Sequence, residues 1–280
     1  MTATESHSND PSDPAPTSSL PSFFPVAIAF AAREFRTLLR NRFLQVFFLI
    51  ALAGGFASTG LTPTIEAIPF ILLQLTLYLV PLFSILIGLS SAHGELEEHP
   101  FLFSQPVSRF ALVTGKAFAL AISLGAILFF AFLSGLIFSP RTGALLLLWG
   151  MSLLLAGVFV SLGLAIGCTT RERSRGIIYA LLAWLFLLIG FDLIAYGAAL
   201  TPFVQQQPLL WLGILLMNPV DAVRVAMLFH LEDIPFTVRT DLRLATFWMD
   251  HLVVWVLILC SAWISILLLW SRWRLNRREF

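Results

Sequence analysis

The stretch GALLLLWGMSLLLAGVFVSLGLAIGC occupies residues 143–168, and none of its 26 residues is charged. A helix of about 20 apolar residues crosses the hydrocarbon core of a bilayer, so this stretch is long enough to span a membrane. Five further segments share its length and character. We place the six spans near residues 43–61, 68–91, 112–138, 143–168, 177–200 and 247–270. The sequence therefore predicts an all-α polytopic membrane protein with six transmembrane helices.

The composition of the whole chain agrees with this prediction. Of the 280 residues, 58% are hydrophobic and 12% are charged, with a mean hydropathy of +0.89. Soluble domains carry about 25% charged residues, so a soluble enzyme is excluded. The 17 basic and 16 acidic residues nearly balance, which leaves no basic field to hold nucleic acid.

The distribution of the basic residues predicts the orientation. If the amino terminus is cytosolic, thirteen of the 17 basic residues fall inside and four fall outside. The inside set is Arg33, Arg36, Arg40, Arg42, Arg109, Lys116, Arg171, Arg173, Arg175, Arg272, Arg274, Arg277 and Arg278. The outside set is Arg141, Arg224, Arg239 and Arg243. By the positive-inside rule, both termini are cytosolic in a plasma (bacterial inner) membrane.

The chain before the first span has two parts. Residues 1–24 are rich in Ser, Thr, Pro and Asp, which predicts a disordered cytosolic tail. Residues 25–42 alternate apolar positions with arginines at helical spacing, among them Arg33, Arg36 and Arg40. This pattern predicts an amphipathic helix in the interface of an anionic leaflet, with packing on the protein's own cytosolic part as the alternative.

The remaining chain divides by its hydrophobic pattern. The six-span domain covers 43–270, and residues 271–280 form a basic cytosolic tail. A cytosolic segment, 92–111, follows the second span, and a basic turn, 169–176, follows the fourth. Residues 201–246 form an outer segment between the fifth and sixth spans. Within it, Leu209 to Met217 is too short to span and is predicted to be re-entrant or interfacial.

Motifs for metal or nucleotide binding are absent from the sequence. His93-Gly-Glu-Leu-Glu-Glu-His99 matches neither His-Glu-x-x-His nor its inverse, so we expect no metal site there. Thr114-Gly-Lys116 lacks the earlier glycine and the following Ser or Thr of a phosphate loop. We therefore expect no cofactor on this chain; if ATP drives the protein, another polypeptide binds it.

Asp192 lies well inside the fifth span, where a charged carboxylate costs about 2.5–3.5 kcal/mol. Two interpretations stay open. The carboxylate lines a functional pathway, or it is protonated or bonded to a neighbouring helix. Gly163 and Gly167 in the fourth span are spaced for close helix packing, either within the chain or between subunits.

A helix start is predicted in the outer segment. Asn218 suits an N-cap, Pro219 the first helical position and Asp221 the positive end of the dipole. One apolar face is formed by Val220, Val223 and Met227. We expect this helix to lie along the membrane or to dock on a partner. A copper interpretation would use Met227 with His230, and Met249 with His251.

FLFSQPVSRFALVTGKAFAL, residues 101–120, resembles the cytosolic coupling element of type-2 ABC-transporter permeases, the ABC-2 family. The matching residues are Ser104, Pro106, Val107, Ser108, Arg109, Gly115 and Lys116. The similarity continues in the basic amphipathic helix, the six spans and the Asn-Pro-Val-Asp helix. Asn218 to Arg224 looks most like the permeases of copper-maturation exporters for nitrous oxide reductase. Gly94 stands further from Pro106 than in the family pattern.

This resemblance implies the permease subunit of an ABC exporter. The permease would move its substrate with ATP and Mg bound on a separate cytosolic ATPase, would have no catalytic residue, and would form a homodimer. An outer-face protein would dock at 201–246. The coupling residues would be Gly94, Glu95, Glu97, Glu98, Ser104, Pro106, Val107, Ser108, Arg109 and Lys116. Two alternatives are a membrane anchor of a multiprotein complex and an ion-coupled secondary transporter that uses Asp192.

Overall fold

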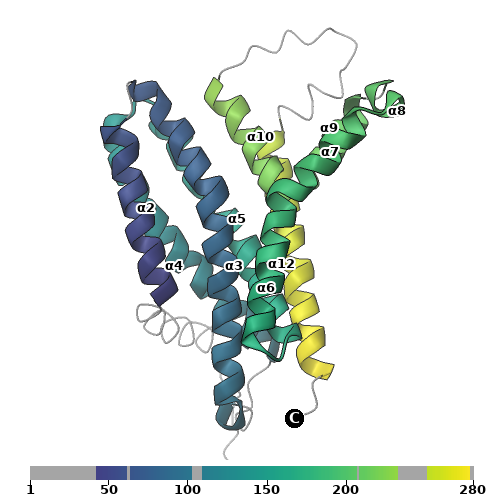
Figure 1. Ribbon diagram of the computed structural model, residues 1–280. Coiled ribbons are helices and arrows are strands. Elements are labelled where there is room, and N and C mark those ends of the chain that lie inside the picture. The colour runs from purple at the N-terminus through teal and green to yellow at the C-terminus, as the bar shows by residue number, and fades with distance from the viewer. Residues whose placement is uncertain (1–41, 62–63, 103–108, 207, 233–250, 278–280) are drawn as a thin grey trace, which may run out of the picture.

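The structure is a computed structural model that describes residues 42–61, 64–102, 109–206, 208–232 and 251–277. The elements in these residues are helical (Figure 1). They are α2 (Arg42–Gly60), the 3₁₀-helix η1 (Ile65–Ala67), α3 (Ile68–Leu102), α4 (Arg109–Phe138), α5 (Thr142–Thr169), α6 (Arg173–Leu185), the π-helix η2 (Phe186–Gly190), α7 (Phe191–Ala199), α8 (Pro202–Gln206), α9 (Pro208–Leu215), α10 (Pro219–Glu232) and α12 (Leu252–Arg277).

Several sequence predictions concern residues outside this description. They are the tail 1–24, the amphipathic helix 25–42 apart from Arg42, the coupling residues Ser104, Pro106, Val107 and Ser108, residues 233–250 of the outer segment, and residues 278–280.

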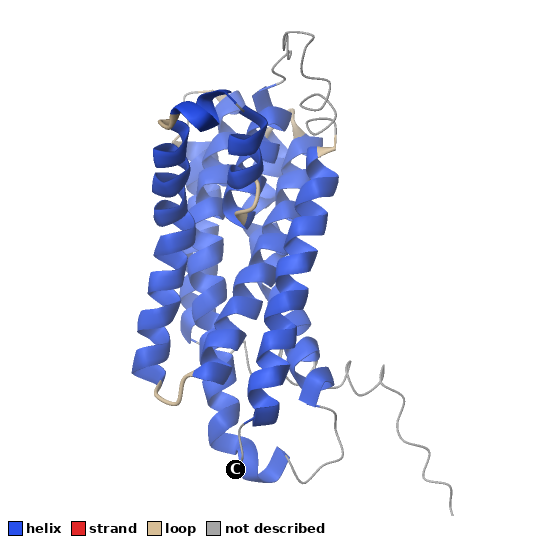
Figure 2. Ribbon diagram, turned by 90° about the vertical axis from the view of Figure 1, so that its right-hand side faces the viewer, coloured by secondary structure: helices blue, strands red, loops and turns tan. Residues whose placement is uncertain are grey.

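Among the described residues, six helical segments are long and apolar enough to cross a membrane, as predicted. They are Arg42–Gly60, Ile65–Gly94, Val113–Phe138, Thr142–Thr169, Arg173–Ala199 and Leu252–Leu275. Five of them lie within a few residues of the predicted spans; the sixth ends five residues later than expected. Figure 2 shows the long helices side by side along a common axis. We call the end with Arg42, Gly94 and Thr169 the lower end, and the opposite end, with Gly60 and Ala199, the upper end.

Helix α5 forms the centre of the bundle. It packs against α3, α4, α10 and α12, and it is the most buried of the six spans. Its glycines allow α3 to approach closely, because a Cβ on Gly163 would overlap the Ile85 carbonyl oxygen and lie 2.8 Å from the Leu89 nitrogen. Gly167 lies against Ala92, which is also on α3. The small-residue spacing of the fourth span therefore serves packing within the chain.

The fifth span is interrupted by a π-helical segment. α6, η2 and α7 follow one another without a loop, and the Phe191 amide bonds to the Phe186 carbonyl, a spacing of five residues. π-Segments inside helices are common at bends and at functional sites. Figure 1 shows α7 leaning away from the line of α6. The lower half of the span packs on α3 and α5, whereas α7 packs against α8 and α9.

Residues 208–232 form a re-entrant hairpin. α9 descends beside α7, the chain turns at Leu216–Asn218, and α10 leads back to the upper end. The turn is held by α12, where Trp255 donates to the Leu216 carbonyl at 3.2 Å and Trp263 donates to the Met217 carbonyl at 3.3 Å. The hairpin turns back on itself, as the re-entrant alternative predicts, and the re-entrant or interfacial position of Leu209 to Met217 in a membrane stays a prediction.

The position of α10 differs from our expectation of a helix on the membrane surface or on a partner. It packs against α3, α5 and α12, and its buried residues include Ala222 and Ala226 besides the predicted apolar face. Small residues on the second face allow close approach to neighbouring helices. The polar residues at its start are bonded inside the protein, so α10 can enter the bundle.

Candidate functional site

The first candidate site is the lower end of α3. The helix continues without a break for eight residues beyond Gly94, about 12 Å at about 1.5 Å per residue. Glu95, Glu97 and Glu98 lie on this extension, so the polar segment begins as a continuation of the second span and not as a separate helix. Arg109 is the first residue of α4. Four of the predicted coupling residues therefore lie on α3, and the chain re-enters the bundle at Arg109.

A buried lysine holds α3 where it leaves the bundle. Lys116 of α4 is 6% exposed, and its Nζ donates to the Ser91 carbonyl oxygen at 2.8 Å. A buried ammonium group is costly unless it is hydrogen-bonded, so this contact fixes α4 against α3. The sequence singled out Lys116 from the family motif but gave no signal for its carbonyl partner.

The turn between α5 and α6 contacts the same part of α3. His93 is buried, with Nδ1 at 3.1 Å from the Leu89 carbonyl and Nε2 at 3.5 Å from the Thr170 hydroxyl. Gly176 leaves room for this imidazole, because a Cβ there would lie 3.1 Å from its Cε1. Arg173 reaches the Ser90 hydroxyl at 3.4 Å. We call Ser90, Ser91, His93, Lys116, Thr170 and Arg173 the lower cluster.

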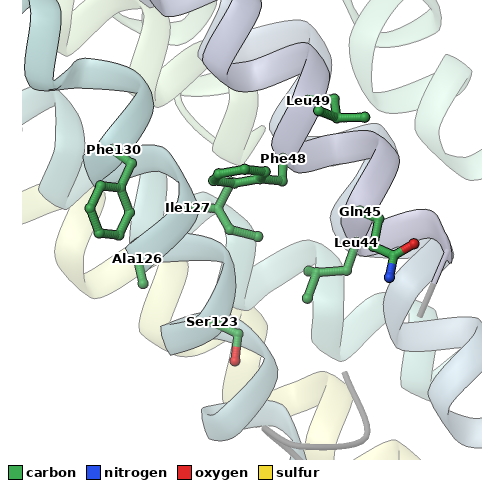
Figure 3. A pocket seen from close by; sticks show the side chains of 8 residues that line it. All are labelled: Leu44, Gln45, Phe48, Leu49, Ser123, Ala126, Ile127 and Phe130. Atoms are coloured by element: carbon green, nitrogen blue, oxygen red, sulfur yellow. The ribbon is translucent and has the colours of Figure 1, made fainter. Parts of the chain in front are cut away.

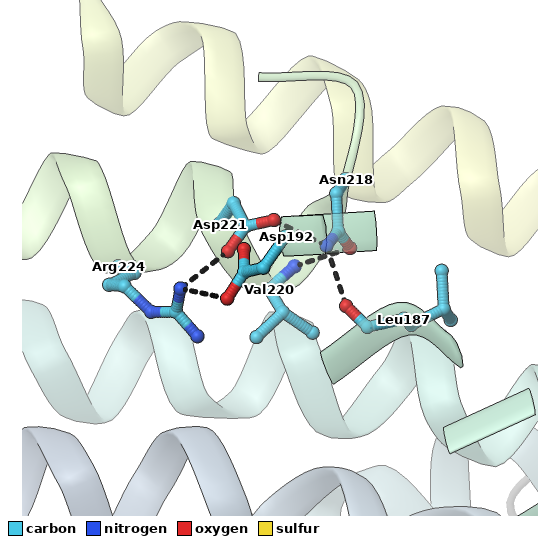
Figure 4. A network of polar contacts seen from close by, with 6 residues as sticks. All are labelled: Leu187, Asp192, Asn218, Val220, Asp221 and Arg224. Atoms are coloured by element: carbon cyan, nitrogen blue, oxygen red, sulfur yellow. Dashed lines mark hydrogen bonds and ion pairs between the residues drawn. The ribbon is translucent and has the colours of Figure 1, made fainter. Parts of the chain in front are cut away.

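The second candidate site lies at the start of α10 (Figure 4). Asn218 is 1% exposed, and its Oδ1 accepts from the Val220 amide at 3.2 Å, which confirms the predicted N-cap. Its Nδ2 donates to the Asp221 carboxylate at 2.6 Å and to the Leu187 carbonyl at 2.7 Å. Leu187 belongs to the π-segment η2, so Asn218 joins the re-entrant turn to the middle of the fifth span.

Two carboxylates share one guanidinium beside this asparagine. Arg224 lies 2.8 Å from the Asp221 carboxylate and 2.9 Å from that of Asp192. The Asp192 side chain is 38% exposed and that of Asp221 is 1% exposed. Asp192 is thus bonded to a neighbouring helix, and a role of its carboxylate in a pathway stays a prediction. We call Asp192, Asn218, Asp221 and Arg224 the upper cluster.

Sequence reasoning named all four residues of the upper cluster but did not bring them together. Asp192 and Arg224 are 32 positions apart in the sequence, a separation that carries no periodic signal, and the pairing follows from the re-entrant path of α9 and α10. The contact of Arg141 was also not predicted from the sequence. Its guanidinium donates to the Leu231 carbonyl near the end of α10, where a cation is favourable.

An apolar groove opens between α2 and α4 (Figure 3). It has a volume of about 540 Å³ and is lined mainly by Leu44, Phe48, Leu49, Ala126, Ile127 and Phe130. Its polar lining residues are Gln45 and Ser123, both toward the lower end, and Ser123 donates to its own helix at Ala119. This lining does not suit a hydrophilic or charged cargo.

The copper interpretation gains no geometric support from the described residues, in which no three His, Cys, Asp or Glu side chains converge on a possible metal position. Met227 is fully buried, whereas His230 is exposed. Met249 lies outside the described residues.

The fold and the two clusters define a polytopic helical protein with polar contacts at the lower end of its bundle and inside its upper half. Residues 28–280 match the family model described as "ABC-2 family transporter protein". The chain belongs to this family and is the permease subunit of an ABC transporter. Permeases of this family have no catalytic activity themselves and pair with ATPase subunits.

Two curated relatives are similar over most of the chain, and both are named "Probable ABC transporter permease protein NosY". The protein from Pseudomonas aeruginosa is 29% identical over 226 residues, which cover 72% of this chain and 81% of the relative. The protein from Stutzerimonas stutzeri is 26% identical over 265 residues, which cover 87% of this chain and 96% of the relative.

Proposed function

We propose that two copies of this chain form the membrane part of an ABC exporter, with the lower end of each copy in the cytosol. The basic residues support this orientation, because Arg42, Arg171, Arg173, Arg175 and Arg272 all lie at the lower end. Six spans supply half of a usual transport path. A two-fold pair is the common symmetry for such an assembly.

The coupling mechanism that we propose uses residues 94–109 as the contact with the ATPase. ATP and Mg bind on the ATPase, and its closing motion pushes on the extension of α3. Glu95, Glu97, Glu98 and Arg109 make charge-assisted contacts there. The segment that carries Ser104, Pro106, Val107 and Ser108 connects α3 to α4. The push therefore reaches both helices.

The observation that carries this proposal is the unbroken helix from Ile68 to Leu102 together with the lower cluster at its exit. A continuous helix transmits displacement along its axis. Lys116 then passes the movement to α4, and His93 passes it to the turn at Thr170. A displacement at the lower end would thereby reach three spans.

The test is co-purification of the ATPase from native membranes in mild detergent. Arg109→Glu is expected to lower the recovered ATPase at least fivefold, about 1 kcal/mol or more, while the permease remains folded. Arg42→Glu, an exposed charge reversal at the same end, is the matched control and should leave recovery unchanged. Equal recovery with both variants would remove Arg109 from the contact.

Measuring ATP hydrolysis in the recovered complex separates the permease from the two alternatives. A membrane anchor would bind the ATPase without changing its rate of ATP hydrolysis, whereas a permease changes that rate. An ion-coupled transporter would work without an ATPase. Family membership favours the permease over both.

A second proposal, copper-enzyme maturation, rests on the resemblance of Asn218 to Arg224 and on the two relatives named NosY. The cargo pathway would then pass the upper end, where Asp192 lies and where a periplasmic protein would dock on the segment 201–246. Deleting the gene in its host should lower the copper content of nitrous oxide reductase. Unchanged copper content would separate this chain from that pathway.

A further inference from the structure

The upper half of the fifth span is weakly attached to the bundle. α7 packs against α8 and α9, which lean away with it in Figure 1. Its large apolar side chains are exposed, with Leu193 at 65%, Ile194 at 55% and Tyr196 at 67%. In a membrane, close packing between helices and not burial of apolar surface holds a helix in place, and α7 has little packing against the central helices.

The π-segment supplies a bending point below α7. The change of bonding register between Phe186 and Gly190 interrupts the regular helix, and such segments are where helices kink. Asn218 donates to the Leu187 carbonyl inside this segment at 2.7 Å. The contact anchors the bending point to the re-entrant turn, while the residues above it remain free of that anchor.

The upper cluster divides into a buried half and an accessible half. Asn218 and Asp221 are each 1% exposed, whereas the side chains of Asp192 and Arg224 are 38% and 25% exposed. Separation of Asp192 from Arg224 would leave the guanidinium bonded to Asp221 at 2.8 Å. Arg224 keeps a partner when the pair opens, and the partly exposed Asp192 carboxylate must then reach water or take up a proton, because an unpaired charge inside a span is costly.

We propose that the Asp192–Arg224 ion pair is a releasable latch that joins the first turn of α7 to α10, and that α7 swings about the π-segment during the transport cycle. Asn218 and Asp221 are positioning residues that keep the bending point and Arg224 in place. The latch needs no contact with the cargo. The inference rests on the chain being a transporter subunit and does not depend on the coupling residues at the lower end.

Distance measurement by electron paramagnetic resonance tests this inference. Spin labels replace Tyr196 on α7 and His230 on α10, both exposed, in the permease purified with its ATPase, and the buried Cys168 and Cys260 are replaced by alanine. α10 is a suitable reference because Arg141 holds it near its end. Labelled chains are diluted with unlabelled ones so that each complex carries at most one labelled copy. The wild-type latch should then give one short Tyr196–His230 distance without nucleotide and a second, longer one when ATP is trapped by vanadate.

Three variants identify the ion pair as the cause. Asp192→Asn should raise the long-distance population without nucleotide roughly fivefold, because the charge that holds Arg224 is gone. Asp192→Glu keeps the charge and should retain the wild-type distribution. Glu172→Gln removes a carboxylate from an exposed ion pair with Arg175 at the lower end and is the matched control.

Several outcomes would overturn the latch. The wild-type distance could be the same with and without nucleotide, or Asp192→Asn could leave the distribution unchanged. A shift in Asp192→Glu as large as that in Asp192→Asn would show that packing, and not charge, holds α7. A shift in Glu172→Gln would show that the change is not specific to the upper cluster.

Discussion

Both parts of the bundle have side chains bonded to backbone carbonyls, and the upper part also has an ion pair between two helices. At the lower end, buried side chains bond to backbone carbonyls, as Lys116 does to Ser91. At the upper end, two partly exposed side chains on different helices form the ion pair Asp192–Arg224. A bond to a carbonyl moves with the helix that carries it, whereas an exposed ion pair can separate and re-form. The lower end is therefore built to transmit movement and the upper end to change state.

The largest effect is expected where transmission depends on helix contact. Gly163→Leu would place side-chain atoms inside the α3 backbone at Ile85 and Leu89 and force the two helices apart. We expect a loss of about 3 kcal/mol or more, measured as thermal unfolding in detergent. Gly150→Leu on the same helix is the control, because no atom lies within 4 Å of a Cβ there. Equal stability of the two variants would contradict the close α3–α5 contact.

A smaller effect is expected for the buried lysine. Lys116→Met keeps the length of the side chain but removes its hydrogen bond to the Ser91 carbonyl, with an expected cost of about 2 kcal/mol. The ATPase should still bind, but its stimulation by the permease should fall. Arg173→Gln removes an exposed contact to the neighbouring Ser90 and should have little effect on stimulation. Comparable losses in the two variants would show that burial is not what makes this contact important.

Substitutions of Asn218 separate its role as the cap of α10 from its role as the anchor of Leu187. Asn218→Ser retains a cap for α10, and Asn218→Ala loses it, a difference of about 1 kcal/mol in stability. Both variants remove the donor to Leu187, so both should speed hydrogen exchange at the amides of 186–191 by a similar factor. Exchange that follows the stability difference instead would assign Asn218 to capping alone.

The sequence was sufficient for the elements whose signal is local. Span lengths follow from apolar runs, and the N-cap at Asn218 follows from four consecutive residues. The packing role of Gly163 could be predicted only as one of two alternatives, because spacing shows that helices approach but not which helix approaches. The α3 backbone at Ile85 decides that question.

The parts that could not be predicted depend on contacts distant in sequence. Lys116 and Ser91 are 25 residues apart, and Asn218 and Leu187 are 31 residues apart. In each contact a side chain meets a backbone carbonyl, which every residue possesses, so residue type gives no signal. The burial of α10 was missed because helical spacing predicts one apolar face, whereas Ala222 and Ala226 allow a second face to pack.

The smallest effect on stability is expected when Arg141 is replaced. Replacing Arg175 at the lower end provides the comparison, because each substitution removes one cation. Arg141→Gln removes a charge from the end of α10 and should cost about 0.5 kcal/mol. Arg175→Gln breaks the exposed Glu172 ion pair at the lower end, and it should cost a similar amount or less. The two should nevertheless differ in the label distances, because Arg141 holds the reference helix of the latch. A broader Tyr196–His230 distance distribution in Arg141→Gln, with no change in Arg175→Gln, would show that the Arg141 contact fixes the position of α10 although it contributes little stability.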